Sequence, residues 1–263
     1  MTAPPVHRSR GGLRRKLGAV ARVVAALALA GGVYTAFMPS SSAQDTSGLS
    51  YSAQKGKQLY ETSCITCHGA NAEGVPGRGP SLIGVGQAAV YFQVSTGRMP
   101  MARQEAQAER KTPVFTDAQT EQIAAYIQEI GGGPQLPTGS LSGGDIAAGG
   151  ELYRVNCSSC HGFSAGGGAL SSGKFAPTLH PATDKQIYAA MLTGPQNMPV
   201  FGDNELTPQE KMDIIAYIQN TKSDQSPGGW SIGAIGPTTE GLVIFLVGIT
   251  SLLFATLWIA GKS

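Results

Sequence analysis

The stretches "CITCHG", residues 64–69, and "CSSCHG", residues 157–162, decide the fold of this 263-residue chain. They hold all four of its cysteines and two of its four histidines. The sequence before them is repeated as well, because "GKQLYETSCITCHG" (56–69) matches "GGELYRVNCSSCHG" (149–162). Further matching stretches follow the cysteine motif of each copy in the same order. The pattern predicts a tandem duplication of one domain.

Each copy predicts the same helical arrangement. One helix runs up to the first cysteine, and a later short helix ends at Gly97 or Gly194, where a left-handed cap residue is expected. The last helix of each copy begins with a capping box, Thr-x-x-Gln at 116–119 and Thr-Pro-x-Glu at 207–210. No stretch alternates convincingly as a strand. We therefore expect a mainly α fold.

Composition shifts and glycine-rich stretches set the expected boundaries of the chain's segments. We expect a basic N-terminus with a signal or anchor segment at 1–43, a first domain at 44–130, a linker at 131–144, a second domain at 145–222, a second linker at 223–240, and a transmembrane helix at 241–261.

Two apolar segments flank the repeated part. The first, "LGAVARVVAALALAGGVYTAFM" (17–38), follows a cluster of basic residues and is long enough to span a bilayer. It also fits a signal peptide, because "SSA" at 41–43 resembles a cleavage site. The second, "GLVIFLVGITSLLFATLWIAG" (241–261), carries no charge and predicts a transmembrane helix. The first segment therefore stays open between anchor and signal peptide.

The basic residues before the first apolar segment indicate the orientation of the chain. Basic flanks remain in the cytoplasm, so the repeated part is expected outside the cell membrane. Both ends are then cytoplasmic if the N-terminal anchor is retained. Residues 44–240 carry 12 Lys and Arg against 17 Asp and Glu, so no basic face for nucleic acid is expected.

The spacing within each cysteine stretch indicates one cofactor. On a helical turn, residues i and i+3 lie on one face, so Cys64 and Cys67 can reach the same flat ligand, with His68 directed at its centre. Cys-x-x-Cys-His is the attachment pattern of c-type haem. The pattern recurs at Cys157, Cys160 and His161, so we expect two covalently bound haem c groups.

Three other interpretations of the cysteines remain to be weighed. Disulfides Cys64–Cys67 and Cys157–Cys160 explain the pairs but not the histidine after each. A zinc site needs a fourth ligand in each copy, and no second pair of such residues lies nearby. A thioredoxin-like redox pair expects a βαβ setting, which is missing.

Each copy resembles a class I cytochrome c domain, with its first helix, attachment site, "GPSL" or "APTL" stretch, Met-Pro and last helix. The resemblance implies that the carbonyl groups of Pro80 and Pro177 accept the Nδ1 proton of the ligand histidines. It also implies a methionine as the second axial ligand.

Aligning the copies places Met99 opposite Met198, each followed by proline, and these are the expected iron ligands. Met101 rivals Met99. Met191 and Met212 lie at core spacing and are read as packing residues, and His180 as a loop histidine rather than an alternative ligand.

Nearly the full chain resembles the di-haem cytochrome c subunit (cytochrome cc) of the actinobacterial menaquinol–cytochrome c reductase, the cytochrome bcc complex. The resemblance implies a membrane-anchored electron relay without substrate chemistry of its own. Electrons would come from the Rieske iron–sulfur subunit, beside the cytochrome b subunit, and pass to a cytochrome aa3 oxidase in the same supercomplex. The alternatives are a di-haem subunit of another membrane oxidoreductase and a di-haem peroxidase-like enzyme, which needs an open axial position.

Two stretches outside the motifs stay ambiguous. "ARQEAQAERK" (102–111) follows the first Met-Pro, has no counterpart in the second copy, and reads as a solvated charged face, with partner binding as the alternative. "SDQSPGGWSIGAIGPTTEG" (223–241), with Trp230, reads either as a flexible tether or as a segment at the bilayer surface or on a partner.

Overall fold

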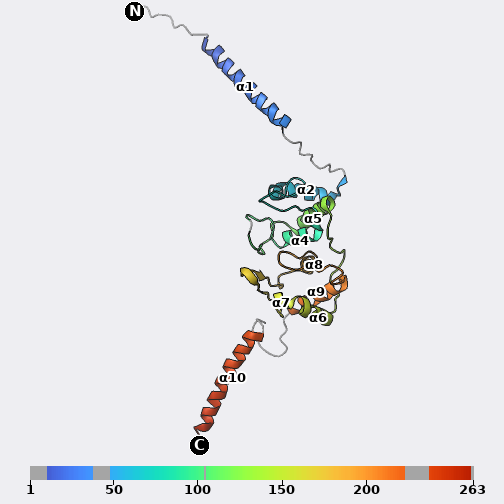
Figure 1. Cartoon of the computed structure of the whole chain (residues 1–263), viewed down its shortest axis with the longest axis vertical. Helices are drawn as coiled ribbons and strands as arrows, with labels where there is room; N and C mark the ends of the chain where they lie inside the picture. The colour runs from blue at the N-terminus through green and yellow to red at the C-terminus, as the bar shows by residue number, and fades with distance from the viewer. Residues whose placement is uncertain (1–10, 38–47, 104, 223–236, 262–263) are drawn as a thin grey trace, which may run out of the picture. The chain divides into compact units, whose positions relative to one another are not determined.

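The structure of the chain is a computed structural model, which describes residues 11–37, 48–103, 105–222 and 237–261 (Figure 1). It comprises two units, Met1–Asp45 and Thr46–Ser263. Several expectations fall outside the described residues: the first basic residues, the "SSA" site, most of the linker at 223–240 with Trp230, and Lys262.

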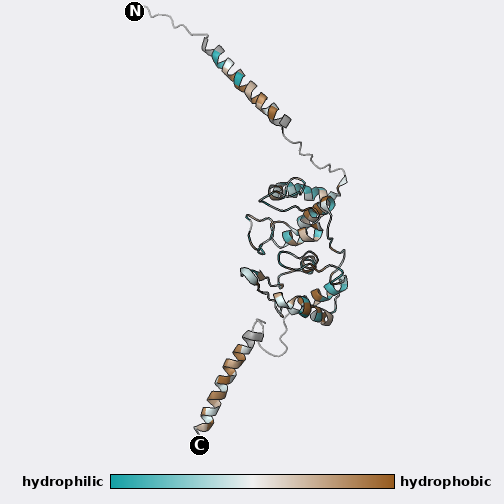
Figure 2. Ribbon diagram, in the orientation of Figure 1, coloured by the Kyte–Doolittle hydropathy of each residue, from teal (hydrophilic) through white to brown (hydrophobic). Residues whose placement is uncertain are grey.

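The first unit consists of the helix α1 (Gly11–Phe37), and the second unit ends with α10 (Pro237–Ala260). Both helices are long and apolar enough to cross a membrane, over Arg15–Val33 and Gly241–Ala260. Hydropathy colouring shows α10 apolar along its length, whereas α1 begins hydrophilic and becomes apolar (Figure 2). These helices match the two apolar segments expected from the sequence.

The first copy is built from four helices: α2 (Tyr51–Ser63), α3 (Ile65–His68), α4 (Gly86–Ser95) and α5 (Asp117–Gly131). Helix α2 packs closely on α5, because a Cβ added at Gly56 would lie 1.9 Å from the Gln122 carbonyl oxygen. Only glycine allows the two backbones to approach so closely. The buried face of α5 carries Ile123 and Ile127.

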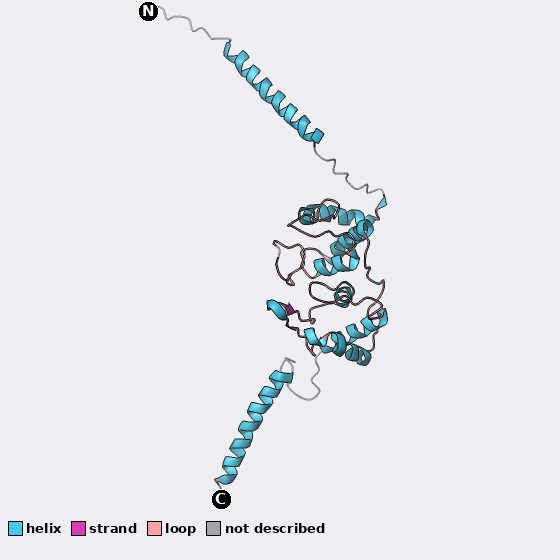
Figure 3. Ribbon diagram, viewed as in Figure 1, coloured by secondary structure: helices cyan, strands magenta, loops and turns pink. Residues whose placement is uncertain are grey.

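The second copy repeats this arrangement with α6 (Ile146–Asn156), α7 (Ser158–His161), α8 (Asp184–Thr193) and α9 (Pro208–Lys222). Gly149 lies where α6 meets α9, and its added Cβ would be 1.9 Å from the Asp213 carbonyl oxygen. Between α7 and α8 lie the antiparallel two-residue strands β1 (Gly168–Ala169) and β2 (Phe175–Ala176), joined through the short helix η2 (Ser171–Gly173). Figure 3 shows the mainly helical fold.

The caps predicted from the sequence are present. Thr116 and Gln119 form a capping box at α5, and Thr207 and Glu210 exchange the same pair of hydrogen bonds at α9. Gly97 and Gly194 have positive φ angles of 68° and 55° after α4 and α8. Local sequence therefore sets both the starts and the ends of these helices.

The two copies pack against each other through α4 and α8 (Figure 1). Gln186 on α8 donates from Nε2 to the carbonyl oxygen and the hydroxyl of Ser95, each at 3.2 Å. Lys185 forms an ion pair with Glu121 of α5 at 2.5 Å. The stretch at 131–144 contacts α4, since Ala88 of α4 donates its N–H to the Pro134 carbonyl at 3.1 Å.

The stretch at 102–111, expected to be a solvated face, bridges to the second copy. Gln107 exchanges two hydrogen bonds with the backbone of Phe175, and Ala108 exchanges two with the side chain of Gln196. Arg110 donates to Gln186 and to the Pro181 carbonyl. The insertion thus contacts another part of the same chain, which sequence alone did not reveal.

Candidate haem sites

In each copy the first cysteine follows directly on a long helix, and a single helical turn carries the motif. In the first copy the N–H of Cys64 donates to Tyr60 at 2.8 Å, and the N–H of His68 donates to Cys64 at 3.0 Å. In the second copy the corresponding bond from His161 to Cys157 is 2.9 Å. The helical turn assumed from the spacing is therefore present twice.

A buried tyrosine from the preceding helix holds the chain just after each histidine. Tyr60 donates its hydroxyl to the Gly69 carbonyl, and Tyr153 donates to the Gly162 carbonyl, both at 2.8 Å. The repeated Leu-Tyr before each motif was the only signal of this role in the sequence. Burial raises the pKa of both phenols, so they remain donors at neutral pH.

The orientation of each histidine ring follows from one hydrogen bond. His68 Nδ1 lies 2.7 Å from the Pro80 carbonyl oxygen, and His161 Nδ1 lies 3.0 Å from that of Pro177. A carbonyl oxygen only accepts, so Nδ1 carries the proton and Nε2 keeps a free lone pair. Burial lowers the pKa of His161, although the Pro177 hydrogen bond opposes this shift. In both rings the lone pair of Nε2 is thus free to bind a metal ion.

All four cysteines are free thiols. Burial, and then the neighbouring Cys67, raises the pKa of Cys64 to about 11. Burial, and then Cys160, raises the pKa of Cys157 to about 12. These thiols therefore stay protonated at neutral pH. Among the described residues, no three His, Cys, Asp or Glu side chains converge on a point that could hold a metal ion.

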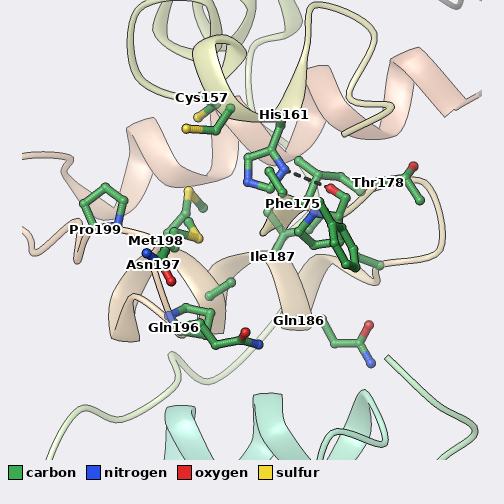
Figure 4. Close-up of a pocket in the computed structure, with 18 of the residues that line it drawn as sticks. Cys157, His161, Phe175, Thr178, Gln186, Ile187, Gln196, Asn197, Met198 and Pro199 are labelled. Atoms are coloured by element: carbon green, nitrogen blue, oxygen red, sulfur yellow. Dashed lines mark hydrogen bonds between the residues drawn. The ribbon is translucent and has the colours of Figure 1, made fainter. Parts of the chain in front are cut away.

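The second copy contains a cavity of about 240 Å³ that collects its proposed ligands (Figure 4). Cys157, Cys160 and His161 line it together with Met198. The remaining wall is largely apolar, with Ile187, Phe201, Ile214 and Ile218 among its members. Two thiols, an imidazole and a thioether on one apolar cavity form a donor set that fits a haem c.

The other sulfur and nitrogen candidates of the second copy differ in position. Met191, read from the sequence as a packing residue, is buried and also lines the cavity. His180 donates from Nε2 to the Ser164 carbonyl oxygen at 2.8 Å, because a carbonyl oxygen can only accept. That bond occupies the ring nitrogen of His180 in the loop, in agreement with its reading as a loop residue.

In the first copy, His68 is buried and Met99 is half-buried against the apolar core. The N–H of Met99 donates to the Gln93 carbonyl at 3.0 Å, which fixes the start of the Met-Pro segment. Met101 is half-buried too. Two buried hydroxyls in this copy, Thr120 Oγ1 and Tyr126 Oη, have no hydrogen-bond partner.

Arg98, which directly precedes Met99, belongs to no motif in the sequence. Its side chain is only 6% exposed and lines the cavity of the second copy. Its guanidinium lies over the Phe92 ring at 4.8 Å, while Nε and Nη1 have no hydrogen-bond partner. An arginine before a methionine gives no local signal, and the second copy has no arginine at the matching position.

Family models match the two copies separately. Residues 53–131 match the model "Cytochrome c", and residues 144–218 match "Cytochrome C oxidase, cbb3-type, subunit III". Both descriptions name haem proteins of the cytochrome c type, in agreement with a fold of two cytochrome c domains.

Proteins from other organisms match the chain from end to end. The "Cytochrome bc1 complex cytochrome c subunit" of Corynebacterium diphtheriae is 49% identical over 100% of both chains. The protein of the same name from Mycobacterium bovis is 49% identical over 97% of this chain and 95% of its own. A more distant relative, the "Cbb3-type cytochrome c oxidase subunit FixP" of Bradyrhizobium sp., is 30% identical over 74% of this chain and 60% of its own.

Proposed function

Because the chain belongs to the family of cytochrome c subunits of the cytochrome bc1 complex, we propose that it is a membrane-anchored relay with two haem c groups. It is a respiratory electron-transfer subunit. The observation that carries the proposal is the pair of equivalent sites, each with a Cys-x-x-Cys-His turn and a prolyl carbonyl at the histidine. The duplication supports two haems rather than one.

The chain's own residues supply attachment and axial ligation. Cys64 and Cys67 would hold one haem and Cys157 and Cys160 the other, each cysteine adding its S–H across one vinyl group, with sulfur bonding to one carbon and the hydrogen going to its neighbour. His68 and His161 present Nε2 to the iron, and the carbonyl groups of Pro80 and Pro177 hold the rings in place. Met99 and Met198 complete the two ligand sets.

A haem c whose axial positions are both filled by protein takes up and releases one electron and leaves no place for a substrate. Apolar side chains, among them Ile187, Ile214 and Ile218, line the cavity together with His161 and Met198. The direct packing of α4 on α8 keeps the two sites in one compact body. These features favour a relay over a peroxidase-like enzyme, which needs an open axial position.

The anchors and partners follow from the apolar helices and the family. We propose that α10, and α1 where it is retained, hold the chain in the cell membrane with both copies on the extracytoplasmic side. The relay takes electrons from a Rieske iron–sulfur subunit beside a cytochrome b subunit. It delivers them to a cytochrome aa3 oxidase.

The test removes one haem at a time from the assembled respiratory complex. Cys64→Ala with Cys67→Ala, and separately Cys157→Ala with Cys160→Ala, should each leave one covalent haem on the chain. Each pair should also abolish quinol-driven oxygen consumption, because a series relay fails when either step is missing. Met212→Leu, on α9 and outside the cavity lining, serves as the control and should retain both haems and the rate.

Two results would contradict the proposal. A variant lacking one haem that still consumes oxygen at the full rate would show that the haems do not act in series. Carbon monoxide binding to the reduced, unsubstituted chain would reveal an open axial position and favour the peroxidase-like alternative.

A further inference from the structure

The cavity of the second copy carries positive charge that nothing in its wall balances. Three cationic side chains line it, Arg98, Arg110 and Lys174, and no carboxylate is among the residues that line it. Lys174 donates to the Asn197 side chain at 3.0 Å, a neutral partner. A cavity lined in this way favours an anionic occupant, and the buried Arg98 contributes most to this preference, because a buried charge is costly unless it is paired.

Arg98 is the most deeply buried of these three cationic side chains. It is 6% exposed, and Nε and Nη1 are buried without a hydrogen-bond partner. The Phe92 ring stabilises its charge only in part, at 4.8 Å from the guanidinium carbon. An unpaired buried guanidinium is costly, so a ligand that pairs with it gains correspondingly.

Arg110 is held in place by the second copy itself. Its Nη1 and Nη2 each lie 3.2 Å from Oε1 of Gln186, and Nη2 also donates to the Pro181 carbonyl at 3.1 Å. Gln186 is buried, lines the cavity, and donates in turn to Ser95 of α4. Figure 4 shows the Gln186 side chain directed from α8 toward the first copy. Its acceptors, Gln186 Oε1 and the Pro181 carbonyl, are both neutral, so the charge of Arg110 is available to an anion.

We propose that Arg98 and Arg110, both contributed by the first copy, form a carboxylate site for the propionate groups of the haem in the second copy. This inference rests on the proposed function, because it takes the haem at Cys157, Cys160 and His161 as given. A haem c carries two carboxylates, and a guanidinium binds a carboxylate through paired hydrogen bonds. The first domain thus completes the haem site of the second.

The arrangement links the two sites through adjacent residues. Arg98 faces the second haem's cavity, while Met99 is the proposed iron ligand of the first. The positive charge disfavours the oxidised form of the second haem, which carries one more positive charge than the reduced form. The arginines therefore raise the reduction potential of that haem. They also keep its propionates ionised, so that potential varies little with pH near neutrality.

The test is a redox titration of the full chain in its complex, with one haem labelled. Met198→His exchanges the methionine of the second haem for histidine, which lowers its potential and separates it from the first. In this background, Arg98→Gln should lower the labelled potential further and make it fall with rising pH between pH 6 and pH 8. Arg98→Lys keeps the charge and should retain most of the potential.

Arg103→Gln is the matched control, because Arg103 belongs to the same segment but its side chain is 82% exposed and paired with Glu105. It should leave both potentials unchanged. Arg110→Gln changes a surface-accessible residue and should lower the labelled potential by less than Arg98→Gln, which keeps the test available if Arg98→Gln fails to fold.

Three results would overturn the inference. The labelled potential could stay unchanged in both glutamine variants, the first haem alone could shift, or Arg98→Lys could shift the potential as far as Arg98→Gln. The haem count on the unsubstituted chain separates the two proposals. A missing second haem would overturn the proposed function and the inference together, whereas two haems with an unmoved potential would overturn the inference alone.

Discussion

His68 in the first copy is 9% exposed, whereas His161, at the same position in the second, is more exposed and lines a cavity. In the first copy, Met99 and Cys64 are partly buried against the apolar core. The second takes part of its wall from the first copy, through Arg98 and the segment that ends at Lys111. The two copies therefore keep the same arrangement of helices but differ in the residues that surround the ligand histidine.

The largest expected difference between the copies concerns the axial methionines. Met198→Leu should abolish the low-spin spectrum of one haem, and Met99→Leu that of the other, because leucine provides no sulfur ligand. Absorption spectra of the reduced and oxidised chain measure this. Met191→Leu is the control for the second copy and Met101→Leu for the first. If Met101→Leu rather than Met99→Leu removes the signal, the alignment of the two copies is wrong.

Substituting the glycine at the helix crossing should reduce stability by the same amount in both copies. Gly56→Ala and Gly149→Ala each place a Cβ 1.9 Å from a carbonyl oxygen of the crossing helix. We expect each to destabilise its copy by about 3 kcal/mol through overpacking, as measured by thermal unfolding of the solubilised chain. Gly150→Ala is the control, since its Cβ would meet side-chain atoms rather than backbone, the Tyr217 ring at 3.1 Å and Arg154 Nη1 at 3.4 Å. Equal stability of all three variants would contradict the helix crossing.

Substitutions at one matching position of α5 and α9 should change the free energy of unfolding by different amounts. Lys211 is 0% exposed and donates to Asp203 and to the Leu206 carbonyl, each at 2.7 Å. Lys211→Met should cost about 2 kcal/mol, because it leaves a buried carbonyl without its donor. Thr120, the equivalent residue, has an unpartnered hydroxyl, so Thr120→Val should change the free energy of unfolding by less than about 0.5 kcal/mol. Denaturant unfolding of both variants measures the two losses of stability. A Thr120→Val variant destabilised as much as Lys211→Met would contradict this prediction.

The smallest expected difference is between the two caps. Thr116→Ala and Thr207→Ala should each cost about 1 kcal/mol at pH 7. Hydrogen bonds from the Thr207 backbone and hydroxyl lower the pKa of Glu210 below its usual 4.5. A lowered carboxylate pKa adds stability that is present above the usual pKa and lost as pH falls through the native one. The cost of Thr207→Ala should therefore shrink at pH 3, whereas that of Thr116→Ala, beside neutral Gln119, should not.

Much of the fold could be predicted because its signals are local. The capping boxes and the left-handed glycines depend on residues a few positions apart, and they appear where expected. The cysteine and histidine motif is equally local. The tyrosine hydrogen bond behind it was not anticipated, because Tyr60 reaches a carbonyl nine residues away on a turn whose path the sequence does not show.

The contacts between the copies could not be predicted for the same reason. Gln107 and Phe175 are 68 residues apart, and Gln186 and Ser95 are 91 apart. No periodicity connects such positions, so the charged insertion read as a solvated face. Arg98 carries no pattern in the sequence, and only its burial beside the other copy's cavity distinguishes it from an exposed arginine.

The central claim is that each copy carries one covalently bound haem. The most direct measurement is the intact mass of the chain, purified from membranes and denatured. We expect two haem increments on the polypeptide mass, and the same spectrum decides whether residues 1–43 are retained. A mass without haem increments would contradict the relay and return the four cysteines to a redox or disulfide role.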